Sequence, residues 1–311
     1  MPRLRDIVHS LRTQPGYALM RGAARFGGVR AAVGGLRRLA HAPALPSRLA
    51  ALAARSAASP FAALDREAFV QRLERDGVAF GLTLPPATVE AIRAFAAARP
   101  CHADRRADAG FMATELAQAQ AALGKPILVA QCFNTATDCP AIAALVDDPV
   151  LQWIAARYLR SLPRFVGANL WWTFPVQALE ADRDRHAHLF HRDVDDFRFF
   201  KFFFYLTDVE PGDGAHVCVV ASHREPPRTR PGDRWNIRRY GDDEIARSFP
   251  AERIVEICGE AGTGFAENTL CVHKGLTPTR APRLLLQLQF ALYDYGVMHD
   301  RRDPAALRRL V

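Results

Sequence analysis

The stretch HLFHRDVDDFRFFKFFFYLTDV, residues 188–209, decides the fold of this chain. Its second half holds six Phe among the eight residues 197–204, which predicts a buried strand. Directly before that strand stands a polar run, HRDVDD, residues 191–196. A polar run beside so apolar a segment is either a solvated turn that feeds the strand, or a site that needs imidazole and carboxylate groups at the mouth of a barrel.

The chain beyond residue 162 reads as short strands separated by turns rich in Gly, Pro, Asp and Asn. The expected strands are residues 164–174, 187–190, 199–209, 216–220, 253–258, 264–265, 270–272 and 284–293. Roughly eight short strands with long excursions are what a double-stranded jelly-roll barrel requires.

The chain before residue 162 is mainly helical. Helices are expected at residues 65–75, 86–98 and 140–159, strands at 78–82 and 127–133, and a polar loop at 101–112. Helices first and strands second predict an α+β chain, a double-stranded β-helix (a jelly-roll or cupin-like barrel) with a helical N-terminal layer. We expect the barrel domain to span residues 61–311.

Composition places the chain among soluble globular proteins, with 49% hydrophobic and 24% charged residues in 311. No apolar run approaches the roughly 20 residues that a membrane helix needs. The six cysteines form no CxxC pair, and no secretory signal precedes them. These features predict reduced thiols and a cytoplasmic protein.

The net charge of +8 is concentrated in the N-terminal part of the chain. Residues 1–64 hold ten Arg and a single acid, Asp6, so the remaining residues have almost no net charge and the body carries no overall nucleic-acid footprint. Residues 1–60 are expected to form a basic helical extension rich in Ala and Arg. It is either a set of amphipathic helices packed on the body, a docking element for an anionic membrane surface or a protein partner, or an organellar transit peptide.

His191 and Asp193 are separated by one residue, so in extended backbone both side chains reach the same ion. A second His-x-Asp pair, at residues 102 and 104, falls in the expected polar loop and is interpreted as a chance match. His273, which follows a short apolar segment far downstream, is the expected third ligand. Two His and one carboxylate on one face leave open positions on Fe(II), the arrangement of non-haem oxygenases.

Arg283 lies ten residues after His273, at the start of the strand LLLQLQF. A 2-oxo acid co-substrate with a distal carboxylate favours a planar, permanently charged partner, which Arg provides. Taken alone, Arg283 would more often be a surface charge at a strand edge.

Two long segments then show a resemblance to a known family. HLFHRDVDDFRFFKFFFYLTDVEPGDGAHVCVVASHR and GTGFAENTLCVHKGLTPTRAPRLLLQLQF resemble the phytanoyl-CoA dioxygenase family, as does LERDGVAFGLTLPPATVEAIRAF nearer the N-terminus. The likeness covers about residues 65–295. It implies an iron- and 2-oxoglutarate-dependent oxygenase on a double-stranded β-helix.

The resemblance also implies roles for individual residues. His191, Asp193 and His273 would be the metal ligands and catalytic centre, and Arg283 would hold the far carboxylate of 2-oxoglutarate. Further co-substrate contacts would come from Gln131, Asn134 and Trp172. Some members of the family carry a hydroxyl two residues after the distal His, where this chain has Gly275, so Thr277, Thr279 or a water would substitute.

The expected function is therefore a dioxygenase that uses Fe(II), O₂ and 2-oxoglutarate to hydroxylate or otherwise oxidise a small or carrier-linked metabolite, with release of succinate and CO₂. Related halogenases carry a small residue where this chain has Asp193, so oxidation is favoured over halogenation. The alternative is a jelly-roll protein that binds a metal or ligand without turnover.

Two further features leave alternatives open. Lys201 alternates with Phe203 and Tyr205, so it either reaches solvent from a barrel wall or points inward towards an anionic group. Residues 224–240 hold six Arg among 17 residues and are a candidate lid for anionic substrates, with Arg228 and Arg230 as the expected contacts.

Overall fold

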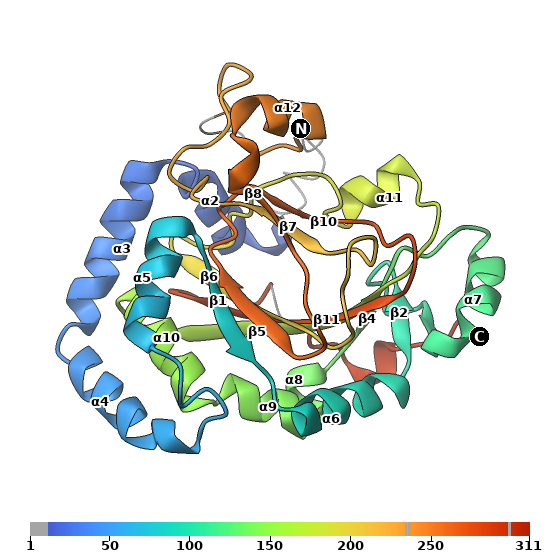
Figure 1. The fold of residues 1–311 in the computed structure, drawn as a ribbon, viewed down its shortest axis with the longest axis horizontal. Coiled ribbons are helices and arrows are strands. Elements are labelled where there is room, and N and C mark those ends of the chain that lie inside the picture. The colour runs from blue at the N-terminus through green and yellow to red at the C-terminus, as the bar shows by residue number, and fades with distance from the viewer. Residues whose placement is uncertain (1–11, 234, 236, 298–299) are drawn as a thin grey trace.

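The computed structural model describes residues 12–233, 235, 237–297 and 300–311 of the chain, and it contains two antiparallel sheets (Figure 1). The larger sheet has the strand order β1-β9-β6-β11-β5-β4-β2-β3, and the smaller has the order β10-β7-β8. The strands are β1 Val78–Thr83, β2 Cys101–Ala103, β3 Gly110–Phe111, β4 Val129–Cys132, β5 Arg164–Thr173, β6 Phe199–Tyr205, β7 His216–Val219, β8 Ile254–Ile257, β9 Thr263–Glu267, β10 His273–Gly275 and β11 Arg283–Ala291.

Helices cover one face of the larger sheet and fill the N-terminal part of the chain, so the expected mixture of helix and antiparallel sheet is confirmed (Figure 1). They are α2 Pro15–Ala23, α3 Gly27–His41, α4 Leu45–Arg55, α5 Arg66–Asp76, α6 Pro86–Ala97, α7 Leu116–Leu123, α8 Thr135–Asp138, α9 Pro140–Val146, α10 Pro149–Leu159, α11 Glu180–Arg185 and α12 Asp242–Ser248.

The Phe-rich strand β6 explains how the two faces of the larger sheet differ. Side chains alternate along a strand, so Phe200, Phe202 and Phe204 share one face, where they join the main core with the helices. Lys201 and Phe203 take the other face, which looks towards the smaller sheet. Phe203 packs there in a second core with residues of the smaller sheet. The apolar run thus forms a strand that is buried on both faces.

The inner face of the larger sheet is unusually polar. Residues that pair across neighbouring strands point to the same face of the sheet, and the pairing can be followed from β2 through β4, β5, β11 and β6 to β9. The polar residues that share this face are His102, Gln131, Asn169, Thr173, Arg283, Gln287, Gln289, Lys201 and Glu267. A buried sheet face with so many polar groups is suited to a binding site, since burial without partners is costly.

Four expectations from the sequence are corrected. The helix expected at residues 140–159 is broken into α9 and α10, because Asp148 precedes Pro149 and its side chain caps the second helix through Val150 N and Leu151 N, both at 2.9 Å. The polar loop expected at 101–112 instead contains strands β2 and β3, of which β2 extends the sheet beside β4. Residues 187–190 form only an isolated bridge at Phe190, and the strand expected at 270–272 begins at His273 instead.

The N-terminal helices meet the body unequally. In α2, Met20 packs with Ala24 and with Val194 of the polar run, and in α4, Leu52 joins the main core. The 15-residue helix α3 buries no residue. Within the part of the chain that the structure describes, no helix has the length and apolar character to span a membrane.

Gly77 ends α5 with a left-handed backbone (φ 75°), as the sequence predicts, and leads directly into β1. We predict that Gly77→Ala lowers the free energy of unfolding by about 2–4 kcal/mol in urea titration. The added Cβ would overlap Cys271 Sγ and lie 2.7 Å from His223 Nδ1. Gly124→Ala is the matched control: it also ends a helix at positive φ but meets nothing within 4 Å, so it should cost about 1 kcal/mol. Equal losses would contradict this account.

Candidate metal centre

His191 and His273 are brought together by their own backbones. The amide of each donates to the carbonyl oxygen of the other, with both N···O distances at 2.9 Å. The amide of Asp193 donates to Thr269 O at 2.8 Å, which holds the polar run against the segment before β10. Three side chains from two distant parts of the sequence therefore point into one place.

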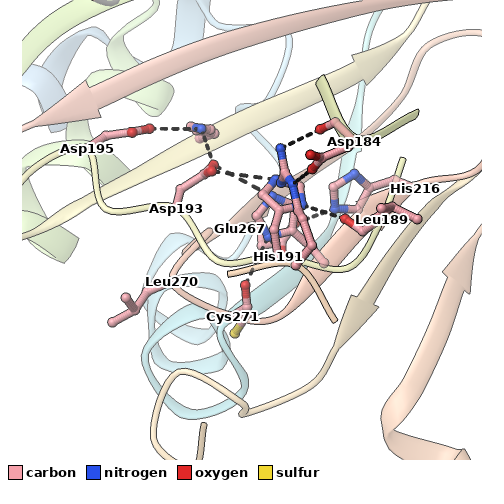
Figure 2. A network of polar contacts seen from close by, with 12 residues as sticks. Asp184, Leu189, His191, Asp193, Asp195, His216, Glu267, Leu270 and Cys271 are labelled. Carbon is pink, nitrogen blue, oxygen red and sulfur yellow. Dashed lines mark hydrogen bonds and ion pairs between the residues drawn. The ribbon is translucent and has the colours of Figure 1, made fainter. Parts of the chain in front are cut away.

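The three candidate ligands converge closely. One ligand atom from each of His191, Asp193 and His273 lies within 4.8 Å of the other two. His191 Nε2 is 3.5 Å from Asp193 Oδ1, and His273 Nε2 is 3.6 Å from Asp193 Oδ2. Figure 2 shows Asp193 between the imidazole group of His191 on one side and Asp195 on the other.

Hydrogen bonds on the far side of each ring determine which nitrogen is free. His191 Nδ1 lies 3.0 Å from Leu189 O, and His273 Nδ1 lies 2.9 Å from Cys271 O. A carbonyl oxygen only accepts, so each Nδ1 carries the proton and each Nε2 presents a lone pair to Asp193. This is how metal-binding histidines are oriented in proteins.

The protonation states agree with this geometry. Burial lowers the pKa of His191 well below its usual value, and the neighbouring His273 lowers it further, so the ring is neutral at pH 7. Burial would raise the pKa of Asp193, but the positive charge of Lys201 outweighs it and holds the pKa well below its usual range. Neutral imidazole and ionised carboxylate are the states that bind a divalent metal.

Lys201 points inward, and this settles the question that the sequence left open. It is 5% exposed, and its Nζ lies 2.6 Å from Asp193 Oδ2 and 3.1 Å from Asp195 Oδ2. Burial would lower the pKa of Lys201, but the two carboxylates outweigh it and raise the pKa. The ammonium group orients Asp193 and screens it from the second carboxylate. The second carboxylate, Asp195, also contacts α2, because the Tyr17 hydroxyl lies 3.4 Å from Asp195 Oδ1.

A second buried pair lies beside His273 and was not expected from the sequence. His216 Nε2 is 2.6 Å from Glu267 Oε2, and the ring of His216 stacks on that of His273 with centroids 5.5 Å apart. Glu267 is fully buried. The pair supports the His273 ring from behind. Only the pairing of β7 with β10 brings His216 there.

Arg283 lies on the inner face at the end of β11, as expected from its place in the sequence. It is 3% exposed, and its guanidinium donates to Gly214 O and, at 3.2 Å, to Thr173 Oγ1. It pairs with no carboxylate among the described residues, and its Nε is buried without a partner there. Burial lowers the pKa of Arg283. A buried cation without a counter-ion favours an anionic ligand.

Arg283 also lies close to the metal-binding strand. Its Nη2 lies 3.7 Å from the position that a Cβ would take on Gly275. Gly275 follows the candidate ligand His273 by two residues, which is about 7 Å along the strand. His188 borders the same spot, and its Nδ1 is 2.9 Å from Thr277 Oγ1. Of the two hydroxyls expected to substitute for the one missing at Gly275, Thr277 contacts His188, which borders that position, whereas Thr279 donates to Gly212 O at 3.2 Å.

The remaining expected co-substrate residues are placed differently. Gln131 lies on the inner face, with its Nε2 2.8 Å from Asn169 Oδ1. Asn134 binds the backbone of Arg302 through both ends of its amide, so it ties down the C-terminal segment.

Trp172 faces away from the site. It packs in the main core and stacks on Phe174, because strand alternation gives the inner face to Trp171 instead.

The Arg-rich segment 224–240 is largely paired within the protein. Arg238 and Arg230 both pair with Glu244, and Arg239 pairs with Asp184 at 2.6 Å near the metal centre. One expected lid residue, Arg230, is thus already partly neutralised. Position 234 of the segment lies outside the described residues.

No protein-family model and no curated protein matches the chain. Solved structures with a similar course of the chain include HygX from Streptomyces hygroscopicus with nickel, 2-oxoglutarate and hygromycin B bound (16% identity, 73% of this chain and 87% of that one, TM-score 0.49). Another is the epimerase SnoN in complex with Fe3+, alpha ketoglutarate and nogalamycin RO (16% identity, 72% of this chain and 82% of that one, TM-score 0.46). A third is AviO1 from Streptomyces viridochromogenes Tue57 (19% identity, 73% of this chain and 95% of that one, TM-score 0.46). At such low identities and TM-scores, we base the proposed function on the residues of this chain.

Lys201→Met should lower the free energy of unfolding of the metal-free protein by about 3 kcal/mol, because it removes the ammonium group that pairs with both Asp193 and Asp195. Urea unfolding followed by tryptophan fluorescence measures it. Lys274→Met is the matched control: that lysine is also buried, but its partner Asp242 is 67% exposed and keeps its hydration, so about 1 kcal/mol is expected. A smaller loss for Lys201 than for Lys274 would show that the buried carboxylates do not depend on this ammonium group.

Proposed function

We propose that the protein is an Fe(II)- and 2-oxoglutarate-dependent dioxygenase of the phytanoyl-CoA dioxygenase type, which oxidises a small or carrier-linked metabolite. The observation that carries this proposal is a buried Arg283 without a carboxylate partner in the described part of the chain, close to three converging ligands. A metal-binding protein without turnover has no use for such an arginine. The co-substrate's far carboxylate would supply the missing counter-ion.

Each residue would have a distinct task in this reaction. The iron would be held by His191, Asp193 and His273. When bound, iron supplies the reaction of O₂ with 2-oxoglutarate, which releases succinate and CO₂. Lys201 would keep Asp193 in its ligating orientation through the hydrogen bond at 2.6 Å. Arg283 would orient 2-oxoglutarate, and Gln131 is retained as a further contact from the same face.

The finer fold assignment is also a proposal. We infer a double-stranded β-helix, in which the two sheets face each other and the isolated bridges His191↔His273 and Val209↔Gly259 join them at the β10 and β8 edges of the smaller sheet. The carboxylate at Asp193 favours oxidation over halogenation. The six cysteines, none in a disulfide, support a reducing compartment, the cytoplasm.

An anaerobic titration of the metal-free protein with Fe(II) and then 2-oxoglutarate tests this function. We expect the weak visible charge-transfer band of the chelated co-substrate in the wild-type protein and its loss in His191→Ala. Arg283→Gln should still bind iron but should weaken 2-oxoglutarate by about tenfold or more, because a charge-assisted bidentate contact is lost.

Arg280→Gln is the matched control for Arg283, since it stands on the same turn but is exposed and paired with Glu210 at 3.0 Å. It should leave both affinities unchanged. Iron binding without the band in folded wild-type protein would instead favour the alternative, a barrel that binds metal without turnover.

We further propose that α3 docks the protein on an anionic membrane surface. This helix has no fully buried residue, exposes Leu36 and Leu39 to 68% and 72%, and carries the exposed Arg38 between them in the sequence. Exposed Leu next to Arg is the combination that binds the interface of acidic lipids.

Leu36→Ser with Leu39→Ser should lower sedimentation with vesicles of phosphatidylserine and phosphatidylcholine by about tenfold, because two apolar side chains no longer insert. The matched control replaces two exposed residues elsewhere, Phe80 and Leu179, by Ser. Wild-type protein that does not sediment with these vesicles would dismiss membrane docking and point to a protein partner for α3.

A further inference from the structure

Arg105 lies in the turn between β2 and β3 and is exposed. Its side chain makes no hydrogen bond or ion pair with any residue that the structure describes. Solvent reaches it, yet burial by surrounding protein lowers its pKa, and the charge of Asp193 partly offsets this. The charge of Arg105 also acts on His188, the residue that borders Arg283. The guanidinium is thus open to solvent, and its charge interacts with those of Asp193 and His188.

The backbone that carries Arg105 is held in an uncommon conformation. Asp104 and Arg105 both have positive φ, at 53° and 61°, in the turn between β2 and β3. Two consecutive residues other than Gly in this region cost about 1 kcal/mol each, and such strain persists only where the surroundings impose it.

A buried cluster at Asp104 supplies this restraint. Lys125 Nζ lies 2.7 Å from Asp104 Oδ2 and 3.2 Å from Asp182 Oδ1, and His186 Nε2 lies 2.9 Å from Asp104 Oδ1. These acids and the histidine could themselves hold a metal ion, but the ammonium group of Lys125 already takes the cation's place. The cluster therefore pins the turn to the segment that leads to His188 and the metal ligands.

The sheet places this turn level with Arg283. Asp104 N donates to Val129 O at 3.0 Å, Val129 pairs with Thr173, and Thr173 pairs with Arg283. Three strand spacings along this row amount to about 14 Å. At that separation each arginine can hold a different molecule. Arg283 would hold the co-substrate, and Arg105 would hold another ligand.

We infer that Arg105 binds an anionic group of the substrate, a carboxylate or a phosphate, beside the metal centre. This inference rests on the proposed function, because it names the class of molecule that the enzyme oxidises. Of the nearby arginines, Arg239 pairs with Asp184, and Arg283 donates to Gly214 O and Thr173 Oγ1 and is assigned to the co-substrate. A planar guanidinium with all its donors available matches the two oxygens of a carboxylate or phosphate.

Calorimetric titration of the full chain with hexanoate, hexyl phosphate and hexanol tests this inference. It is done on the metal-free protein and again with nickel and saturating 2-oxoglutarate. We expect at least one of the two anions to bind more tightly than hexanol, and Arg105→Gln to weaken that anion by about tenfold or more without changing hexanol. Which anion binds distinguishes a carboxylate substrate from a phosphate ester.

Arg106→Gln is the matched control, because Arg106 is the next residue of the same turn, exposed and already paired with Asp108 at 2.7 Å. It should bind the anion as wild type does. Thermal unfolding checks that both turn variants fold.

Three results would overturn the inference. The first is that neither anion binds the wild-type protein, and the second is that Arg106→Gln weakens binding as much as Arg105→Gln. The third is that Arg105→Gln weakens 2-oxoglutarate alone, which would assign the residue to the co-substrate. Because the metal-free titration needs neither iron nor 2-oxoglutarate, failure here is separate from failure of the charge-transfer test.

Discussion

The reciprocal backbone pair between His191 and His273 is the contact on which the rest of the site depends. Two amide–carbonyl bonds at 2.9 Å join the segment before β6 to the start of β10, and through it the larger sheet to the smaller. Backbone bonds of this kind fix position without using any side chain. Both imidazoles are therefore left free to point, with Asp193, at one place.

Unequal pairing of buried charges distinguishes the two ends of this site. At one end Lys201 serves two carboxylates, and the carboxylate that the metal would use is held in position before any ion arrives. At the other end Arg283 has backbone and hydroxyl acceptors only. Buried charge without a partner is expensive, so it persists where a ligand supplies the opposite charge.

Much of the architecture could be predicted because local signals were strong. Asp65 and Gly77 bound α5 as a cap and a left-handed stop, and the Phe run produced β6. The helix expected at 140–159 failed at Asp148 because one proline and one capping carboxylate outweighed a continuous apolar pattern. The interpretation of residues 101–112 as a loop failed because β2 is short and is stabilised by its partner strand β4 rather than by its own composition.

The amino-acid sequence by itself determined which residues could do chemistry: a His-x-Asp pair before a buried strand, a distant histidine, and an arginine ten residues beyond it. Periodicity also determined that Lys201 shares a face with Phe203. Only the tertiary structure decided which face looks inward, and so exchanged Trp171 for Trp172 at the site. It alone also placed His216 and Glu267 behind His273. These are contacts between strands that are far apart in the chain, and no local pattern of residues encodes which strands pair.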